Sequence, residues 1–278
     1  MRFIRNLLIV SFLIIFSNYS YGVYNTHSIF EKDLPPMIND SKGEGFLEED
    51  FNRISQTIID FYQPIFLEKG DILSLNLDWD NPRVNASTGK WGNFATVYLY
   101  GGLARHKFMT PNGFALVICH EIGHHLGGEP RYKKYSWASV EGQSDYYASL
   151  KCFKNYLDNC PECHIPDTTG LDITLVSECS KSGEDFSVCV STAMAGMSIA
   201  QTIAASRVLP KPLGFGTPSD KIVKKTYERH PHPQCRLDTY FAGALCDKDV
   251  ATPDLCSRKN GDSAISSRPL CWFKPKKK

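Results

Sequence analysis

The sequence predicts an α+β fold in which a small, partly antiparallel sheet packs on a pair of helices. Three observations lead to this prediction. Apolar and polar residues alternate over residues 73–79, which is typical of a strand with one buried face, and residues 94–100 predict a second strand. In residues 47–62 apolar residues recur at spacings of three and four, which is typical of an amphipathic helix. All ten cysteines lie between Cys119 and Cys271, so we expect a disulfide-rich part of helices and loops after the sheet.

Residues 1–22 predict a signal peptide that is removed on export. Arg2 and Arg5 form a basic start, and residues 7–16 are apolar except for Ser11. The apolar run is short for a membrane span, and small residues precede an expected cleavage after Gly22. The alternative is an uncleaved anchor. We therefore expect a mature chain of residues 23–278, periplasmic or secreted, with no stable membrane insertion.

Length, charge and cysteine content restrict the class of protein. A chain of 278 residues can form one large domain, and we expect residues 23–278 to do so. A net charge of +1 argues against a nucleic-acid partner, since such partners usually need a basic surplus. Ten cysteines in an exported chain predict up to five disulfides, within a cysteine-rich insertion at residues 151–190 and a C-terminal extension at 247–278 with a lysine-rich tail.

The remaining elements before the cysteine-rich part are expected in this order. Residues 23–45 are polar and contain two adjacent prolines, so they should lie on the surface. The first helix should end at Pro64, because proline lacks the N–H that a helix interior needs. The two strands are separated by a turn at residues 80–82, and Gly101-Gly102 closes the second strand.

Residues 111–128 predict a helix that carries a metal-binding pattern. Thr110 and Pro111 are typical of a helix start, and two glycines follow the last apolar residue. His120 and His124 are four residues apart, so both imidazoles can reach one metal ion from the same face. Glu121 can act on the metal-bound water without becoming a ligand. The alternative is a buried helix that contains these residue types by chance.

A second helix, expected at residues 137–150, supplies the candidate third ligand. A catalytic zinc takes three protein ligands and keeps one position open. Glu141 is the candidate ligand, and Asp145, one turn later, can hold the second ring nitrogen of His120 or His124. Other candidate ligands are Glu129 and, more remotely, Glu162, His164 and Asp167. His125 points away from His124 by about 100° and should be packed or hydrogen-bonded.

The C-terminal half holds further predictions. Cys119 should pack or form a disulfide with Cys152. Cys160 and Cys163 should form disulfides, with partners that the sequence does not reveal, rather than bind zinc or act in redox chemistry. Residues 186–206 carry no charge but are rich in small residues. This composition favours a helix buried against the helix that carries His120 and His124 over a membrane span. Residues 209–218 predict a loop and residues 221–229 a basic helical stretch.

Three motifs together resemble a family of zinc peptidases. His120-Glu121-x-x-His124 with Glu141-x-x-Ser144-Asp145 is similar to the gluzincin pattern. His230-Pro231, followed by Arg236, resembles the His-Pro-x4-Arg segment of the HtpX and CAAX-prenyl-protease type, which includes soluble periplasmic members of the BepA kind. The motifs occur in the family's order over residues 120–236. The missing membrane helices and the cysteine-rich segments depart from the family.

The resemblance implies a zincin-like fold and roles for further residues. His230 would line the site and donate to the oxyanion of the transition state, with Arg236 as second candidate. Val97, Tyr98 and Leu99 would belong to the sheet edge along which a protein or peptide substrate lies extended. From spacing alone, an ordinary core strand is an equal alternative for this segment.

The predicted function is that of an exported, zinc-dependent endopeptidase. One catalytic Zn²⁺ on His120, His124 and Glu141 would activate a water for attack on the peptide carbonyl. Glu121 would be the general base. The alternative is an exported, disulfide-bonded binding or chaperone-like protein whose zinc site is structural or catalytically silent. The presence of Glu121 favours the enzyme, since a structural site needs no base.

Overall fold

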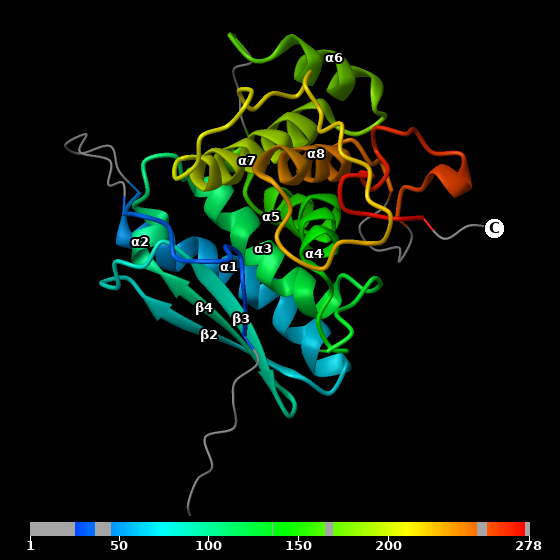
Figure 1. Cartoon of the computed structure of the whole chain (residues 1–278). Coiled ribbons are helices and arrows are strands. Elements are labelled where there is room, and N and C mark those ends of the chain that lie inside the picture. The colour runs from blue at the N-terminus through cyan, green and yellow to red at the C-terminus, as the bar shows by residue number, and fades with distance from the viewer. Residues whose placement is uncertain (1–25, 37–45, 135, 165–168, 249–254, 276–278) are drawn as a thin grey trace, which may run out of the picture.

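In the computed structural model, the central helix α3 (Pro111–Leu126) packs against a mixed sheet on one side and against a layer of helices on the other (Figure 1). The structure describes residues 26–36, 46–134, 136–164, 169–248 and 255–275. The predicted signal peptide at residues 1–22 lies outside these ranges, as does the end of the lysine-rich tail. Within them the chain is α+β, with a four-stranded sheet. The predicted fold class is therefore confirmed at this level.

The sheet has the strand order β1-β3-β4-β2. β2 (Ile72–Asp78) runs parallel to β4 (Phe94–Tyr100), whereas β3 (Ala86–Trp91) is antiparallel to β4 and β1 (Thr26–Ser28) is antiparallel to β3. A two-residue turn joins β3 to β4, and its Gly92 has φ +57°, a conformation that glycine adopts without strain. The sequence predicted β2 and β4 but neither of the other two strands.

The prediction that Val97, Tyr98 and Leu99 lie on a sheet edge is wrong. Val97 pairs with Thr88 of β3 on one side and with Leu75 of β2 on the other, and this double pairing continues along β4. Both sides of β4 are therefore occupied by the protein's own strands. The terminal strands of the sheet are β1 and β2.

The prediction that residues 23–45 lie on the surface is wrong for residues 27–30, whereas residues 31–33 are exposed as expected. Residues 26–28 form β1, and Ile29 and Phe30 belong to the hydrophobic core. Burial of these two side chains draws the segment onto the sheet and offsets the polar character of its neighbours.

α1 (Glu48–Glu68) does not end at Pro64, which lies inside the helix. The predicted end is therefore wrong. Proline in a helix interior costs about 3 kcal/mol, because it removes one intrahelical hydrogen bond and its ring clashes with a carbonyl group of the preceding turn. Phe66, beyond the proline, is 1% exposed and packs in the core. Full burial of a phenylalanine contributes about 1.5–3 kcal/mol, which offsets much of this cost and favours continuation of the helix past the proline.

α3 lies between the sheet and the helices α7 (Phe186–Ala204) and α8 (Pro233–Ala244) (Figure 1). In the part of the chain that the structure describes, α7 is long and apolar enough to cross a membrane by length and composition alone. However, 72% of that window is buried in the protein. The prediction of a helix buried against α3 is confirmed, and the charge-free sequence of α7 is explained by its position in the core.

The second predicted helix begins later and extends further than expected. It consists of α4 (Glu141–Tyr147), a π-helical turn (Ala148–Cys152) and α5 (Phe153–Asp158). Ser139 and Val140, directly before Glu141, are not helical because their backbone groups are used elsewhere: Ser139 N donates to His124 O, and Val140 N donates to Pro130 O. This pairing places the first residue of α4 next to the end of α3.

The rest of the described chain consists of short elements and loops. They are α2 (Gly101–Ala104), α6 (Ile173–Lys181) and two 3₁₀ turns (Pro161–Cys163 and Arg258–Asn260). The prediction of a helical stretch at residues 221–229 is wrong, because these residues form a loop. This segment instead bonds to the C-terminal chain, where Val223 N donates to Leu270 O and Tyr227 N to Trp272 O.

Five disulfides use all ten cysteines. Cys119 of α3 is bonded to Cys152, as the sequence allowed, and Cys160 is bonded to Cys163. The other pairs are Cys179–Cys189, Cys235–Cys271 and Cys246–Cys256. This density of disulfides indicates folding in an oxidising, extracytoplasmic compartment.

Gly142 allows α4 to approach the C-terminal segment closely. A Cβ atom at this position would lie 2.2 Å from Cδ2 of Trp272, whose side chain is fully buried. Gly142→Ala is therefore expected to destabilise the protein by about 1–3 kcal/mol, the typical cost of overpacking. Urea unfolding measures this change, with the exposed Ser180→Ala in α6 as control. An unchanged unfolding midpoint would mean that the indole can move aside at no cost.

Candidate metal centre

His120 and His124 lie on the buried face of α3 with one ring nitrogen of each held by a hydrogen bond. The Nδ1 atom of His120 lies 2.7 Å from Oδ1 of Asp145, and Nδ1 of His124 lies 2.8 Å from the carbonyl oxygen of Ser139. With a proton on Nδ1 donated to these oxygens, the Nε2 lone pair of each ring is available as a ligand. The spacing of four residues turns both rings to the same side of the helix.

Glu141, the first residue of α4, faces both of these rings. Its Oε2 lies 3.4 Å from Nε2 of His120, and its Oε1 lies 3.7 Å from Nε2 of His124. Burial by itself would raise the pKa of Glu141, but the nearby imidazoles of His230 and His124 outweigh it and hold the pKa well below its ordinary value. The carboxylate is therefore ionised, as a metal ligand must be.

A third imidazole, which the sequence did not predict, comes from β1. His27, His124 and Glu141 each offer a ligand atom, and these atoms lie within 4.8 Å of one another. The ring of His27 stacks on that of Tyr132 with centroids 4.5 Å apart, and on that of His124 at 5.1 Å. This buried group could hold a metal ion. Together with His120, these three residues are called the metal group.

The donor atoms fit such an ion. Nε2 of His120, Nε2 of His124 and Oε2 of Glu141 are buried and have no hydrogen-bond partner among the described residues. Buried polar atoms without a partner are rare in native proteins, and coordination to a metal ion would satisfy all three atoms at once. A set of imidazole nitrogens and a carboxylate oxygen is the kind that binds Zn²⁺.

Glu121 lies beside this group but is not part of it. Its side chain is fully buried, and neither carboxylate oxygen has a hydrogen-bond partner in the described ranges. Burial raises the pKa of Glu121 to about 8, although the neighbouring His120 acts in the opposite direction. A metal cation nearby would favour the ionised form. Glu121 is therefore a carboxyl group able to exchange a proton near neutral pH.

Asp145 forms the centre of a buried network behind His120. It accepts hydrogen bonds from Nε and Nη2 of Arg236, at 2.8 and 2.6 Å, and from the hydroxyl of Tyr240. Burial would raise the pKa of Asp145, but Arg236 and His120 keep it below its ordinary value. The negative charge in turn raises the pKa of His120 to about 9 against the effect of burial. The network therefore fixes the orientation of His120 and increases its basicity.

The guanidinium of Arg236 is directed into this network. Besides Asp145 it donates to the carbonyl oxygen of Ile29 through Nη1 and to the hydroxyl of Tyr240 through Nη2. The side chain is 1% exposed. Arg236 thus supports His120 through Asp145, and its guanidinium also binds Ile29 O and Tyr240.

His230 and Tyr132 both reach Glu141. Nε2 of His230 lies 3.3 Å from Oε2 of Glu141 and 2.7 Å from the carbonyl oxygen of Ser28. The hydroxyl of Tyr132 donates to Oε1 of Glu141 at 2.8 Å. Burial, followed by the charge of Glu141, raises the pKa of Tyr132, so this hydroxyl remains a donor. His230 also borders a cavity of about 340 Å³ together with residues 29–35.

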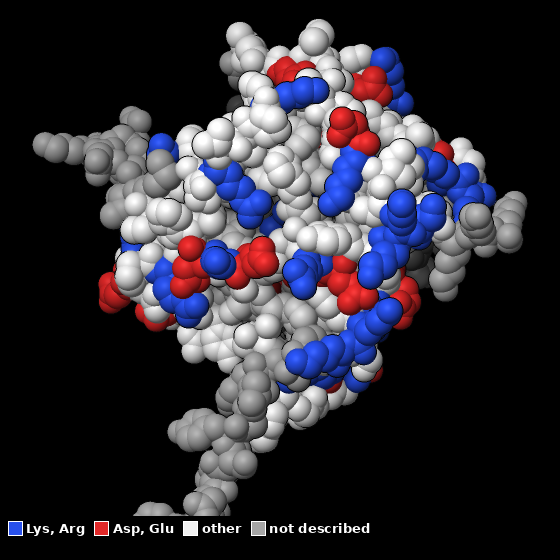
Figure 2. Space-filling view, viewed as in Figure 1, with Lys and Arg blue, Asp and Glu red and all other residues white. Residues whose placement is uncertain are grey.

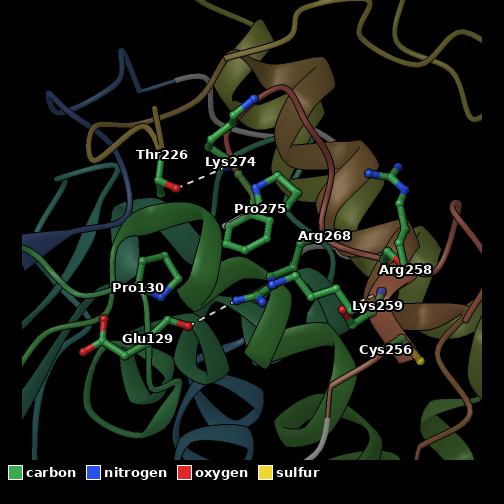
Figure 3. A pocket seen from close by; sticks show the side chains of 12 residues that line it. Glu129, Pro130, Thr226, Cys256, Arg258, Lys259, Arg268, Lys274 and Pro275 are labelled. Carbon is green, nitrogen blue, oxygen red and sulfur yellow. Dashed lines mark hydrogen bonds between the residues drawn. The ribbon is translucent and has the colours of Figure 1, made fainter. Parts of the chain in front are cut away.

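The other candidate ligands lie elsewhere. Oε2 of Glu129 accepts a hydrogen bond from its own loop, at Arg131 N, and Figure 3 shows Glu129 at the rim of a different pocket. His164 bonds to Ser187, and Glu162 lies by the Cys160–Cys163 disulfide. Asp167 lies outside the described residues. His125 bonds to Thr88 and stacks on Trp137, as expected for a packed histidine.

The pocket in Figure 3 has a volume of about 250 Å³ and lies between the Glu129-Pro130 loop and the C-terminal segment. Its basic lining residues are Arg258, Lys259, Arg268 and Lys274. Figure 2 shows Lys and Arg side chains gathered toward the side on which the C-terminal segment runs in Figure 1. This pocket contains none of the residues of the metal group.

Sequence reasoning missed His27, Tyr132 and Tyr240. His27 is the only histidine before residue 106, which is a weak signal without knowledge of the fold. Tyr132 lies in a polar loop with no distinguishing pattern. Tyr240 lies one helical turn after Arg236, so its place beside the guanidinium could have been expected from the helical spacing.

Comparisons of the chain with protein-family models, with curated proteins and with solved structures found no match. The function of the metal group therefore has to be inferred from its own geometry and chemistry.

Proposed function

We propose that this protein is a zinc metalloendopeptidase of the gluzincin type with a zincin-like fold, active in the periplasm or outside the cell. The observation that carries the proposal is the convergence of His120, His124 and Glu141 beside Glu121. Their buried ligand atoms Nε2, Nε2 and Oε2 have no hydrogen-bond partner among the described residues. Two imidazoles, one carboxylate and an adjacent unligated glutamate are the donor set and base of a catalytic zinc site. A protein or peptide is the proposed substrate.

When bound by these three ligands, zinc would supply Lewis-acid chemistry, polarising a peptide carbonyl and activating water. Glu121 accepts the proton of the attacking water and passes it to the leaving amine. Its burial supports this role, because no competing hydrogen bond from the described residues holds the carboxylate. The low dielectric constant of a buried site also strengthens the electrostatic interactions between charged groups there.

The neighbouring residues have supporting roles in this proposal. Asp145 and Arg236 hold His120 in its ligand orientation, so Arg236 is a positioning residue rather than an oxyanion donor. His230 and Tyr132 carry N–H and O–H groups within 3.3 Å of Glu141. Either could donate to the oxyanion that forms on the substrate carbonyl. Loss of such a donor typically lowers turnover by about 10²–10³-fold.

One observation favours a second candidate function. His27, His124 and Glu141 offer ligand atoms within 4.8 Å of one another, and with His120 they would make four protein ligands, a number typical of structural zinc. The protein would then be an exported binding or chaperone-like protein with a catalytically silent site. The buried Glu121 argues against this alternative, because a structural site has no use for a base.

Replacing His120 with alanine tests the proposal. We expect His120→Ala to reduce bound zinc well below one ion per chain and to lose hydrolysis of casein, because one ligand of the ion is removed. Zinc is measured by atomic absorption, and casein cleavage with and without a chelator. His164→Ala, which removes a histidine outside the metal group, is the control. Casein hydrolysis that survives complete removal of zinc would contradict the proposal.

A further inference from the structure

β1 pairs with the sheet in the way that an extended peptide would. Its register with β3 is antiparallel, with Thr26 opposite Gly89 and Ser28 opposite Ser87. The pairing continues beyond the strand, where Ile29 N donates to Ala86 O. Without β1, the free edge of the sheet on this side would be β3. Addition of an extended strand to such an edge is a general mode of peptide recognition.

Two residues of the proposed active site hold the backbone of the same segment. Nε2 of His230 lies 2.7 Å from Ser28 O, and Nη1 of Arg236 donates to Ile29 O at 2.5 Å. The segment is therefore fixed at its carbonyl groups by side chains that belong to a motif far along the chain. Contacts to backbone carbonyls do not depend on side-chain identity, so they could be made to any extended peptide in this position.

His27 is the side chain of this segment that faces the metal group. It alternates along β1 with Thr26 and Ser28, so it points to the opposite side of the strand from both. Its ligand atom lies within 4.8 Å of those of His124 and Glu141, and its ring packs against the rings of both His124 and Tyr132. Only 8% of His27 is exposed.

We propose that His27 is an additional ligand of the metal, and that β1 occupies the substrate edge of β3 so that the protein blocks its own site until this strand is displaced. The inference that β1 blocks catalysis rests on the proposed function, whereas the assignment of His27 as a metal ligand can be tested without it. The substrate that replaces β1 must be extended, because it takes over the pairing with β3. Unfolded or locally extended polypeptides are therefore the substrate class.

The cavity beside His230 supports this arrangement. Residues 29–35, which continue from β1, form one part of its lining, and His230, Pro231 and Arg236 form another. Its volume is about 340 Å³. Displacement of the N-terminal segment would open this space toward the metal group, where side chains of a bound peptide could enter.

The ligand assignment is tested on the full-length, zinc-loaded protein with His27→Phe, which keeps an aromatic ring against Tyr132 but has no ligand nitrogen. X-ray absorption at the zinc edge should show three imidazole ligands in the parent and two in the variant. Extraction of zinc by a chelator should become on the order of 10-fold faster or more, as expected when support for a metal site is lost. His106→Ala removes another buried histidine, outside this group, and should change neither result.

The block is tested by hydrolysis of an unfolded protein such as reduced, alkylated casein. If the site is open only in a minor fraction of molecules, its apparent affinity for substrate equals the affinity of the open form multiplied by that fraction. His27→Phe should therefore raise kcat/KM, by about 10-fold if the open form is near a tenth of the parent population. A second variant, His27→Gln, gives the same comparison with a smaller side chain, and the circular dichroism spectrum verifies that each variant is folded.

The outcomes separate this inference from the proposed function. Equal imidazole counts and equal rates of zinc extraction in parent and variant would overturn the ligand assignment, even if both hydrolyse casein. Three imidazoles in the parent and two in the variant, with no hydrolysis by either, would support His27 as a ligand and refute the peptidase. A lower kcat/KM in both His27 variants would overturn the block, since the strand would then assist catalysis.

Discussion

Glu121→Gln is expected to abolish peptide hydrolysis while the protein keeps its zinc. Glutamine has nearly the same shape as glutamate but cannot accept a proton, and general acid–base catalysis typically contributes about 10²–10⁴-fold to the rate. Glu121 is fully buried and its oxygens have no hydrogen-bond partner among the described residues, so the substitution breaks no existing contact there. The measurement is kcat on a fluorogenic peptide, with zinc content determined on the same sample.

The comparison needs a control for the loss of one carboxylate. Glu49→Gln, on the exposed face of α1, removes the same charge and should leave kcat unchanged. The dependence of kcat/KM on pH adds a second readout. Because a base must be ionised to act, kcat/KM of the parent should fall as pH falls through the pKa of Glu121, and any residual activity of the Gln variant should lack this dependence. Cleavage by Glu121→Gln at the parent rate would refute the assignment of the base.

Arg236→Met is expected to destabilise the protein by about 3–5 kcal/mol. Removal of one partner of a buried ion pair leaves the other charge without compensation. Here the remaining charge is that of Asp145, which is fully buried and would keep only its hydrogen bonds to His120 and Tyr240. Methionine fills a similar volume, so loss of packing is a minor part of the change. Urea unfolding at pH 7 gives the free energy.

The sign of the pH dependence follows from Asp145. Its pKa in the folded protein is below the ordinary value of 3.8, so the stability it contributes is present above that value and is lost as pH falls through the folded pKa. The difference between parent and Arg236→Met should therefore be largest at neutral pH and shrink below about pH 4.

An exposed ion pair provides the matched control. Arg53→Met removes the partner of Asp50 on α1, where the two side chains are 46% and 35% exposed. Such surface pairs contribute about 0–1 kcal/mol, so this variant should behave almost like the parent. If Arg236→Met lost no more stability than Arg53→Met, Asp145 would have to be compensated by other groups or be neutral in the folded protein.

Local spacing explains why part of the candidate site could be predicted. His120, Glu121 and His124 occupy one helix, and the distances between their side chains follow from helical geometry alone. Glu141 and Asp145 are likewise one turn apart, although the helix that carries them begins at Glu141 and not at residue 137. The sequence could not show which histidine Asp145 holds, because that depends on how α4 lies against α3.

The strands show the opposite case. Residues 86–91 contain a glycine and a lysine and few apolar residues, so no strand was predicted there, although Gly92-Asn93 is a recognised hairpin turn signal. As a result, β4 was assigned to the sheet edge when it lies inside the sheet. Three residues of β1 carried still less signal, because a strand of this length is stabilised by its pairing with β3 and not by its own composition.

The sequence by itself determined the α+β class, the export-type cysteine content and the pair of helices with the candidate zinc ligands. These features follow from periodicity and composition, which act over neighbouring residues. Only the tertiary structure decided that His27 joins the metal group, that His230 and Arg236 hold the N-terminal segment, and that β3 is the strand covered by β1. The physical reason is that each of these contacts joins residues about 60 to 200 positions apart, and such contacts depend on packing and backbone pairing that no local pattern encodes.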